Sequence, residues 1–145
     1  MRASPAFLIL AGLLAAAPAW AQQEKTVGGL VVDLGLMSAE KAVQAEGHAE
    51  AHPKTFPSGS QHILITVVDA KTKSRIGDAT VVVSVRAPNG RTEEKPLLHT
   101  QAAGLADYSE LFVFGSSGTY RVRVKITPAH GPKSVVTEFT VHHSM

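Results

Sequence analysis

Cysteine is absent from all 145 residues of this chain. The absence excludes disulfide bonds, thiolate nucleophiles, zinc fingers and iron–sulfur ligation, because each of these needs that side chain. It also excludes a lipoprotein anchor, which is attached to a cysteine. A stable core must therefore come from apolar packing alone, and a chain of this length can bury a sizeable one.

A strong charge of either sign is missing as well. The formal net charge is +2 at pH 7, and part of it (Arg2) lies in the N-terminal leader described below. A chain this close to neutral has no electrostatic footprint for nucleic acid. We therefore expect no nucleic-acid partner.

Signatures of catalysis are also lacking. The sequence has no glycine-rich phosphate loop and no Gly-x-Ser-x-Gly motif. It also offers no nucleophile–base pair and no paired carboxylates from which a catalytic reaction could be inferred. The run HAEAH at 48–52 differs from the zinc motif His-Glu-x-x-His because Glu50 lies midway between the histidines. The His-x-Glu of a zinc deaminase would need a later Cys-x-x-Cys. We expect a protein that is not an enzyme and has no catalytic residues.

The N-terminus has the pattern of a cleaved leader. Arg2 supplies a positive charge, residues 6–17 form an uncharged apolar run, and Ala19-Trp20-Ala21 matches the small-x-small cleavage pattern. The run is shorter than the roughly 20 apolar residues that span a bilayer. These features predict a signal peptide over 1–21, an exported single domain over 22–145, and no membrane insertion after cleavage. An uncleaved membrane anchor is the alternative.

Regularly spaced β-strand patterns fill the rest of the chain. Two runs rich in β-branched residues, 61–69 and 80–86, flank a connection rich in turn formers and predict a hairpin. Similar runs predict five more strands, at 26–36, 91–98, 106–114, 120–126 and 134–142. Gly28 and Gly29 are expected to form a bulge in the first strand. The pattern predicts an all-β fold: a seven-stranded antiparallel immunoglobulin-like β-sandwich with one short helix at most.

The strand predicted at 120–126 has the most regular alternation. Its even-numbered residues are apolar, whereas Arg121, Arg123 and Lys125 occupy the odd positions. One face must enter a core and the other must meet water. Gly118-Thr119-Tyr120 fits a tyrosine corner, in which the hydroxyl bonds to nearby backbone. The three bases are either a solvated outer face or a patch for a partner.

The segment 37–59 interrupts this rhythm. Ser38 is a plausible N-cap for a short helix over 39–46, which Gly47 would end. Connections of this length inside a compact domain are often functional or mobile.

Several of these runs together carry a family resemblance. The segments VVDAKTKSRIGDATVVVSV, GTYRVRVKI and VVTEFTV resemble the YtkA-like group of small exported bacterial sandwiches and, more distantly, the CopC-like copper-resistance proteins. The resemblance implies a location in the bacterial periplasm and a link to metal handling. CopC-like copper(II) sites use a histidine at the mature N-terminus, whereas this chain would begin at Gln22. That arrangement therefore cannot be carried over.

The histidines carry the remaining functional signal. If the strands alternate in direction, five of the seven histidines gather at one end of the sandwich: His48, His52, His62, His142 and His143. Met37 and Glu50 fall at the same end. Imidazole is the commonest metal ligand, carboxylates suit zinc, iron(II) or copper(II), and a thioether favours copper(I). The candidate metal ligands are therefore Met37, His48, Glu50, His52, His62 and His142, and we expect no other cofactor site.

Each candidate ligand also has a plain interpretation. His48 and His52 can be solvated residues of a loop, His62 can cap a strand, His142 can belong to a frayed tail, and Met37 can close the core. Two functional hypotheses follow. One is a periplasmic metal-binding module that buffers or delivers a copper-like or iron-like ion. The other is a non-catalytic interaction sandwich that docks on an exported or membrane protein partner.

Overall fold

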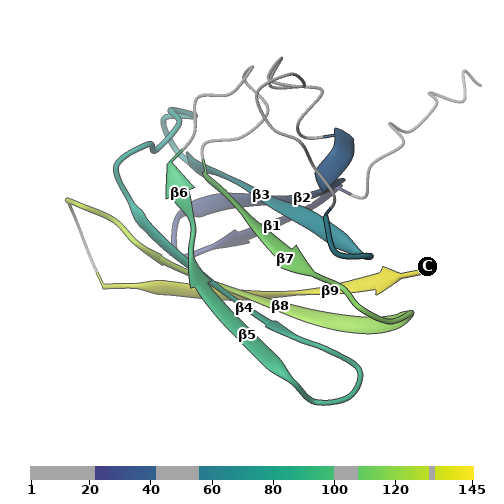
Figure 1. Cartoon of the computed structure of the whole chain (residues 1–145). Helices are drawn as coiled ribbons and strands as arrows, with labels where there is room; N and C mark the ends of the chain where they lie inside the picture. Colours follow the sequence, from purple (N-terminus) through teal and green to yellow (C-terminus); the bar gives the residue numbers. More distant parts are fainter. Residues whose placement is uncertain (1–21, 42–55, 100–107, 131–132) are drawn as a thin grey trace, which may run out of the picture.

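The computed structural model describes residues 22–41, 56–99, 108–130 and 133–145. These residues form nine strands in two antiparallel sheets that pack face to face (Figure 1). One sheet has the order β1 (Gln22–Val27), β2 (Leu30–Ser38), β3 (Ser60–Asp69), β7 (Tyr108–Val113), β6 (Leu98–His99). The other has the order β5 (Thr92–Pro96), β4 (Thr80–Arg86), β8 (Gly118–Thr127), β9 (Val135–His143). The predicted β-sandwich is confirmed, with nine strands rather than seven.

The additional strands lie where the sequence has little apolar character. β1 occupies a polar stretch and pairs with β2 from Gln22↔Gly35 to Val27↔Leu30. Gly28 and Gly29 have φ of 55° and 77° and form the two-residue turn between these strands, not the predicted bulge. The strand predicted at 91–98 is divided between β5 and the two-residue β6, which extends one residue further to His99.

The core lies between the sheets, and β8 alternates most regularly between buried and exposed residues. On β8 the apolar residues Tyr120, Val122, Val124 and Ile126 are fully buried, and the bases between them are exposed. On β9 Phe139 and Val141 face the same interior. The predicted inward faces of these two strands are confirmed, because each apolar side chain gains from leaving water only on the enclosed side.

Two buried tyrosines fix opposite ends of the sandwich. The Tyr120 hydroxyl donates to the carbonyl of Ser116 (2.8 Å) and accepts from the amide of the same residue (3.2 Å), which confirms the predicted tyrosine corner. Towards the other end the Tyr108 hydroxyl donates to the carbonyl of Ile76 (2.9 Å) and accepts from the amide of Ala79 (3.0 Å). Each phenol therefore ties a connection between strands to a buried aromatic ring of the core.

The two lateral edges of the sandwich are bridged by long side chains. At the β1–β9 edge, Lys25 donates to the carbonyl of Glu138 and lies over the Phe139 ring, 5.4 Å from its centre. At the β5–β7 edge, Lys95 donates to the carbonyl of Leu111 (2.6 Å) and lies over the Phe112 ring at 5.1 Å. Each lysine thus satisfies an edge carbonyl of the opposite sheet and covers a core aromatic ring.

The predicted short helix begins as expected. Residues 39–41 are helical, and the Lys41 amide donates to the Ser38 hydroxyl at 3.3 Å, as an N-cap requires. The rest of the predicted helix, 42–46, lies outside the described residues. No helix within the described part of the chain has the length and apolar character needed to cross a bilayer.

Candidate functional site

Met37 and His62 are direct neighbours across two strands. Met37 lies near the end of β2, His62 lies near the start of β3, and the two are partners in the antiparallel ladder. Residues that face each other in such a ladder point to the same side, with their Cβ atoms roughly 5 Å apart. The adjacent Ile63 is fully buried in the core, so His62 and Met37 lie on the outer face of the five-stranded sheet. A thioether and an imidazole are therefore side by side, both half-buried.

His142 lies at the same end of the sandwich but on another surface. It follows the buried Val141 on β9, so it points out of the four-stranded sheet and is exposed. Its Nδ1 atom hydrogen bonds with the Thr119 hydroxyl at 3.0 Å. The sheets of a sandwich pack about 10 Å apart, and His62 and His142 point away from each other on opposite outer faces. One ion cannot contact both, so the structure does not bring His142 to the Met37–His62 pair.

The other three candidate ligands, His48, Glu50 and His52, lie outside the described residues. Within 22–41, 56–99, 108–130 and 133–145, no group of three or more histidine or acidic side chains is arranged to hold a metal ion. The described residues therefore contribute two donors to a candidate site, and the segment between Lys41 and Phe56 carries the others in the sequence.

An acidic pair lies on the same outer face as Met37 and His62. Glu24 on β1 is the ladder partner of Asp33 on β2, four residues before Met37. The pKa of the Asp33 carboxyl is raised above its ordinary value, first by burial and then by the negative charge and hydrogen bond of Glu24. Like charges directly opposite each other destabilise a sheet, so this pair favours retention of a proton.

His143 points the other way from His142 and packs inside the end of the sandwich. Its ring meets Phe114 and Tyr120 edge-on, with centres 5.4 and 6.1 Å away. Its Nε2 atom is buried and has no hydrogen-bond partner among the described residues. This histidine closes the aromatic cluster formed by the stacked Phe114 and Tyr120 rings.

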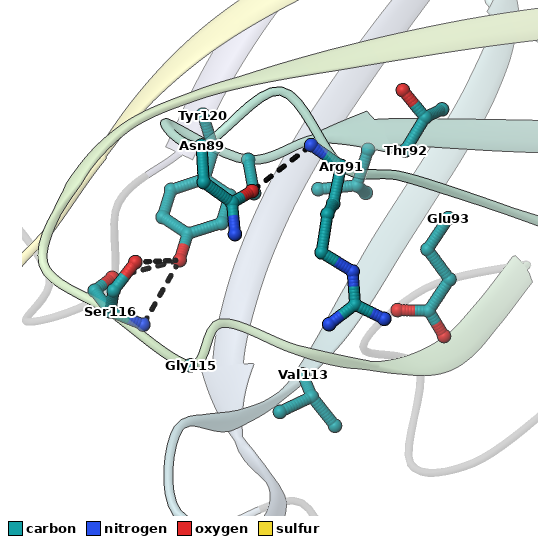
Figure 2. Close-up of a pocket in the computed structure, with 10 residues that line it drawn as sticks. Asn89, Arg91, Thr92, Glu93, Val113, Gly115, Ser116 and Tyr120 are labelled. Atoms are coloured by element: carbon teal, nitrogen blue, oxygen red, sulfur yellow. Dashed lines mark hydrogen bonds between the residues drawn. The ribbon is translucent and has the colours of Figure 1, made fainter.

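A pocket of about 420 Å³ opens at the β5–β7 edge, next to the tyrosine corner (Figure 2). Its lining comes from the β4–β5 and β7–β8 turns and from the strands next to them. It includes Val85, Asn89, Arg91, Glu93, Val113, Gly115 and Tyr120. Figure 2 shows the Arg91 side chain extending towards the strand at Val113. The Arg91 amide is held by the Asn89 side-chain oxygen at 3.0 Å, which fixes the turn that presents the guanidinium.

The sequence reasoning missed this pocket. The local sequence signals here are a turn at Pro88-Asn89-Gly90 and the strand predicted at 91–98, and neither indicates a pocket. What builds the pocket is the approach of the β7–β8 turn, and no local pattern reports that contact.

The two antiparallel sheets, their topology and the tyrosine corner define the chain as a β-sandwich of immunoglobulin type. No protein-family model matches the chain, and no curated protein matches its sequence. Solved structures do match its fold. FetP from uropathogenic E. coli strain F11, expressed recombinantly in the periplasm, aligns with TM-score 0.65 and 11% identity over 86% of this chain and 94% of its own. A copper-bound variant of FetP aligns with TM-score 0.66 and 11% identity over 86% and 95%.

A protein of the DUF4426 family from Pseudomonas aeruginosa PAO1 aligns with TM-score 0.58 and 14% identity over 84% of this chain and 94% of its own. At these identities the comparisons establish the fold.

Proposed function

We propose that the protein is a periplasmic metal-binding module that buffers or delivers a first-row transition-metal ion, with copper as the leading candidate and iron as another. The proposed ligands are Met37, His48, Glu50, His52 and His62. The observation that carries the proposal is the ladder pairing of Met37 with His62 on one outer face, at the strand ends that flank the histidine-bearing segment.

The chemistry of these donors favours copper. A thioether is a soft ligand that selects copper(I), and imidazole binds both copper oxidation states. A carboxylate ligand from Glu50 would also allow the site to bind copper(II), zinc or iron(II). His48 is seven residues from Lys41 in the sequence, and a chain extends at most about 3.5 Å per residue. The covalent connection therefore keeps His48 within about 25 Å of Lys41, three residues beyond the end of β2, which gives it a high effective concentration there.

Two further observations support the proposal. A copper-bound variant of FetP has this fold at TM-score 0.66. The N-terminal leader pattern fits an exported protein.

Metal titration followed by thermal melting tests the proposal. Mature protein without a polyhistidine tag is titrated with copper(I), copper(II), zinc and iron(II), and Tm is measured for each. A ligand that binds only the folded state at 100 times its Kd stabilises that state by about 2.7 kcal/mol, so we expect a clear rise in Tm with at least copper. An unchanged Tm with every metal rejects the proposal.

Variants locate the site. His48→Ala/His52→Ala and His62→Ala should each abolish most of the copper-induced rise in Tm, and Met37→Leu should weaken copper(I) more than copper(II). His142→Ala on the other outer face and His130→Ala at the opposite tip are matched controls and should leave the rise unchanged. Loss of the rise in His142→Ala alone would place the ion on the wrong side of the molecule for this proposal.

A specific observation favours the second hypothesis, an interaction sandwich that docks on an exported or membrane protein. On the outer face of the four-stranded sheet, Arg86 on β4 is the ladder partner of Arg121 on β8, although like charges opposite each other destabilise a sheet. Arg123 and Lys125 continue this exposed basic face. An acidic partner would relieve the repulsion. Arg86→Ser/Arg121→Ser should then abolish capture of that partner while leaving metal binding intact.

A further inference from the structure

The two lateral edges of the sandwich are closed to different extents. At the β1–β9 edge, Gln23 donates to the carbonyl of Thr140 (2.7 Å) and Lys25 donates to the carbonyl of Glu138. These carbonyls are two residues apart, so they point to the same side of β9. Two successive edge carbonyls are therefore satisfied by side chains from the opposite sheet.

At the β5–β7 edge only one of the equivalent positions is closed in this way. Lys95 donates to the carbonyl of Leu111, and the residue two positions further along that strand is Val113. Arg91 lies on β5's side of this edge and extends towards Val113, but no hydrogen bond or ion pair to its guanidinium is found among the described residues (Figure 2). The pocket occupies this unclosed position.

Arg91 carries the one cationic group among the lining residues, and Figure 2 draws it between Val113 and the Glu93 carboxylate. Glu93 also lines the pocket, but its carboxylate is paired with Lys95 at 2.9 Å. The apolar part of the wall comes from Val85 and from Tyr120, whose ring is held rigidly by the tyrosine corner. The volume of about 420 Å³ lies in the range of small-ligand sites.

From this arrangement we infer that the pocket binds a carboxylate flanked by an N–H donor and a short apolar group, the chemistry of a peptide C-terminus or of a free N-acylated amino acid. The planar guanidinium of Arg91 matches a carboxylate through two parallel hydrogen bonds. The Val113 backbone at the open edge accepts the ligand N–H, as in the addition of a short strand. The apolar group packs against Val85 and Tyr120. The Glu93 charge disfavours a dianion such as phosphate.

The test uses the mature, metal-free protein labelled with ¹⁵N and titrated by NMR. The probes are N-acetyl-leucine, N-acetyl-leucinamide (no carboxylate), 4-methylpentanoate (no N–H) and inorganic phosphate. We expect N-acetyl-leucine to shift the amides of Val113, Gly115 and Ser116 in a saturable manner. The amide and phosphate should leave these signals unchanged, and 4-methylpentanoate should bind more weakly. A tetrapeptide ending in leucine distinguishes the sources: tighter binding than the free amino-acid derivative indicates a peptide partner, and equal or weaker binding indicates a small metabolite.

Variants assign the contact to Arg91. Arg91→Gln should weaken N-acetyl-leucine by about tenfold or more, as expected when a charge-assisted bidentate pair is lost. Arg91→Lys keeps the positive charge but loses the two parallel donors of the guanidinium, so it should bind N-acetyl-leucine at an intermediate level. It provides the same test if Arg91→Gln folds poorly. Lys71→Gln, which removes an exposed cation from the connection between β3 and β4, is the control and should bind normally. Absence of saturable shifts, equal binding of the amide, or unchanged binding by Arg91→Gln would each overturn the inference.

Discussion

The β1–β9 and β5–β7 edges of this sandwich share one kind of contact but differ in how many backbone carbonyls are bonded by side chains. In each, a lysine crosses from one sheet to an edge carbonyl of the other and covers a core phenylalanine. The β1–β9 edge adds a second donor, Gln23, whereas the β5–β7 edge leaves its second position open as a pocket. We infer that the closed positions contribute to stability, whereas the open position at the β5–β7 edge is available for a ligand.

The largest effect is expected at the edge that depends on one donor. Lys95→Ala leaves the Leu111 carbonyl without its partner, removes the cation from the Phe112 ring, and frees the Glu93 carboxylate. We expect the free energy of unfolding to fall by about 2 kcal/mol, because a hydrogen bond from a charged group is lost at a half-buried position. Urea unfolding followed by circular dichroism measures the change. A loss below about 0.5 kcal/mol would show that Lys95 is merely a surface residue.

The β1–β9 edge should tolerate the matching change better. Lys25 is exposed and shares its edge with Gln23, so Lys25→Ala should lower the free energy of unfolding by about 1 kcal/mol. Gln23→Ala/Lys25→Ala should lower it by more than the two single changes together, because the first donor partly holds the edge when the second is lost. Strict additivity in a double-mutant cycle would indicate that the two contacts are independent.

The sequence predicted those strands in which apolar and polar residues alternate one by one. The alternation from Tyr120 to Ile126 placed its residues correctly, because burial of one face outweighs every other preference along that strand. β1 was not predicted as a separate strand because most of its residues are polar. It is extended because it pairs with β2 and contacts β9. The contacts that Lys25 and Lys95 make with the opposite sheet are likewise beyond what local alternation can predict.

Only part of the candidate site could be predicted from the sequence. Strand direction correctly brings Met37, His62 and His142 to one end, but direction alone does not say which face a residue occupies. That information was present in the sequence: His142 follows the inward-facing Val141 and so had to point outward. The pairing of Met37 with His62 depends on the register between β2 and β3, which local patterns do not report.

A smaller, pH-dependent effect is expected from the acidic pair on β1 and β2. Because the pKa of Asp33 is raised in the folded protein, the folded state holds that proton more tightly than the unfolded state does. The contribution of Asp33 to stability is therefore fully present below its ordinary pKa of 3.8 and is lost as the pH rises through the raised value. Burial, the larger cause, remains in Glu24→Gln, but the charge of Glu24 is removed. The variant should gain about 0.5 kcal/mol at pH 7 and nothing at pH 3, measured as Tm against pH. An equal gain at both pH values would rule out the charge of Glu24 as its source.

The smallest effect on stability is expected for Arg91, which lies at the open position of the β5–β7 edge. Arg91 is exposed, and no hydrogen bond or ion pair to its guanidinium is found among the described residues, so Arg91→Ala should change the free energy of unfolding by less than about 0.5 kcal/mol. The contrast with Lys95→Ala, four residues away on the same edge, separates a side chain that holds the fold from one that faces a ligand. Denaturant unfolding of both variants in parallel makes the comparison. If Arg91→Ala were as destabilising as Lys95→Ala, Arg91 would be a second closing residue, and the β5–β7 edge would be built like the β1–β9 edge after all.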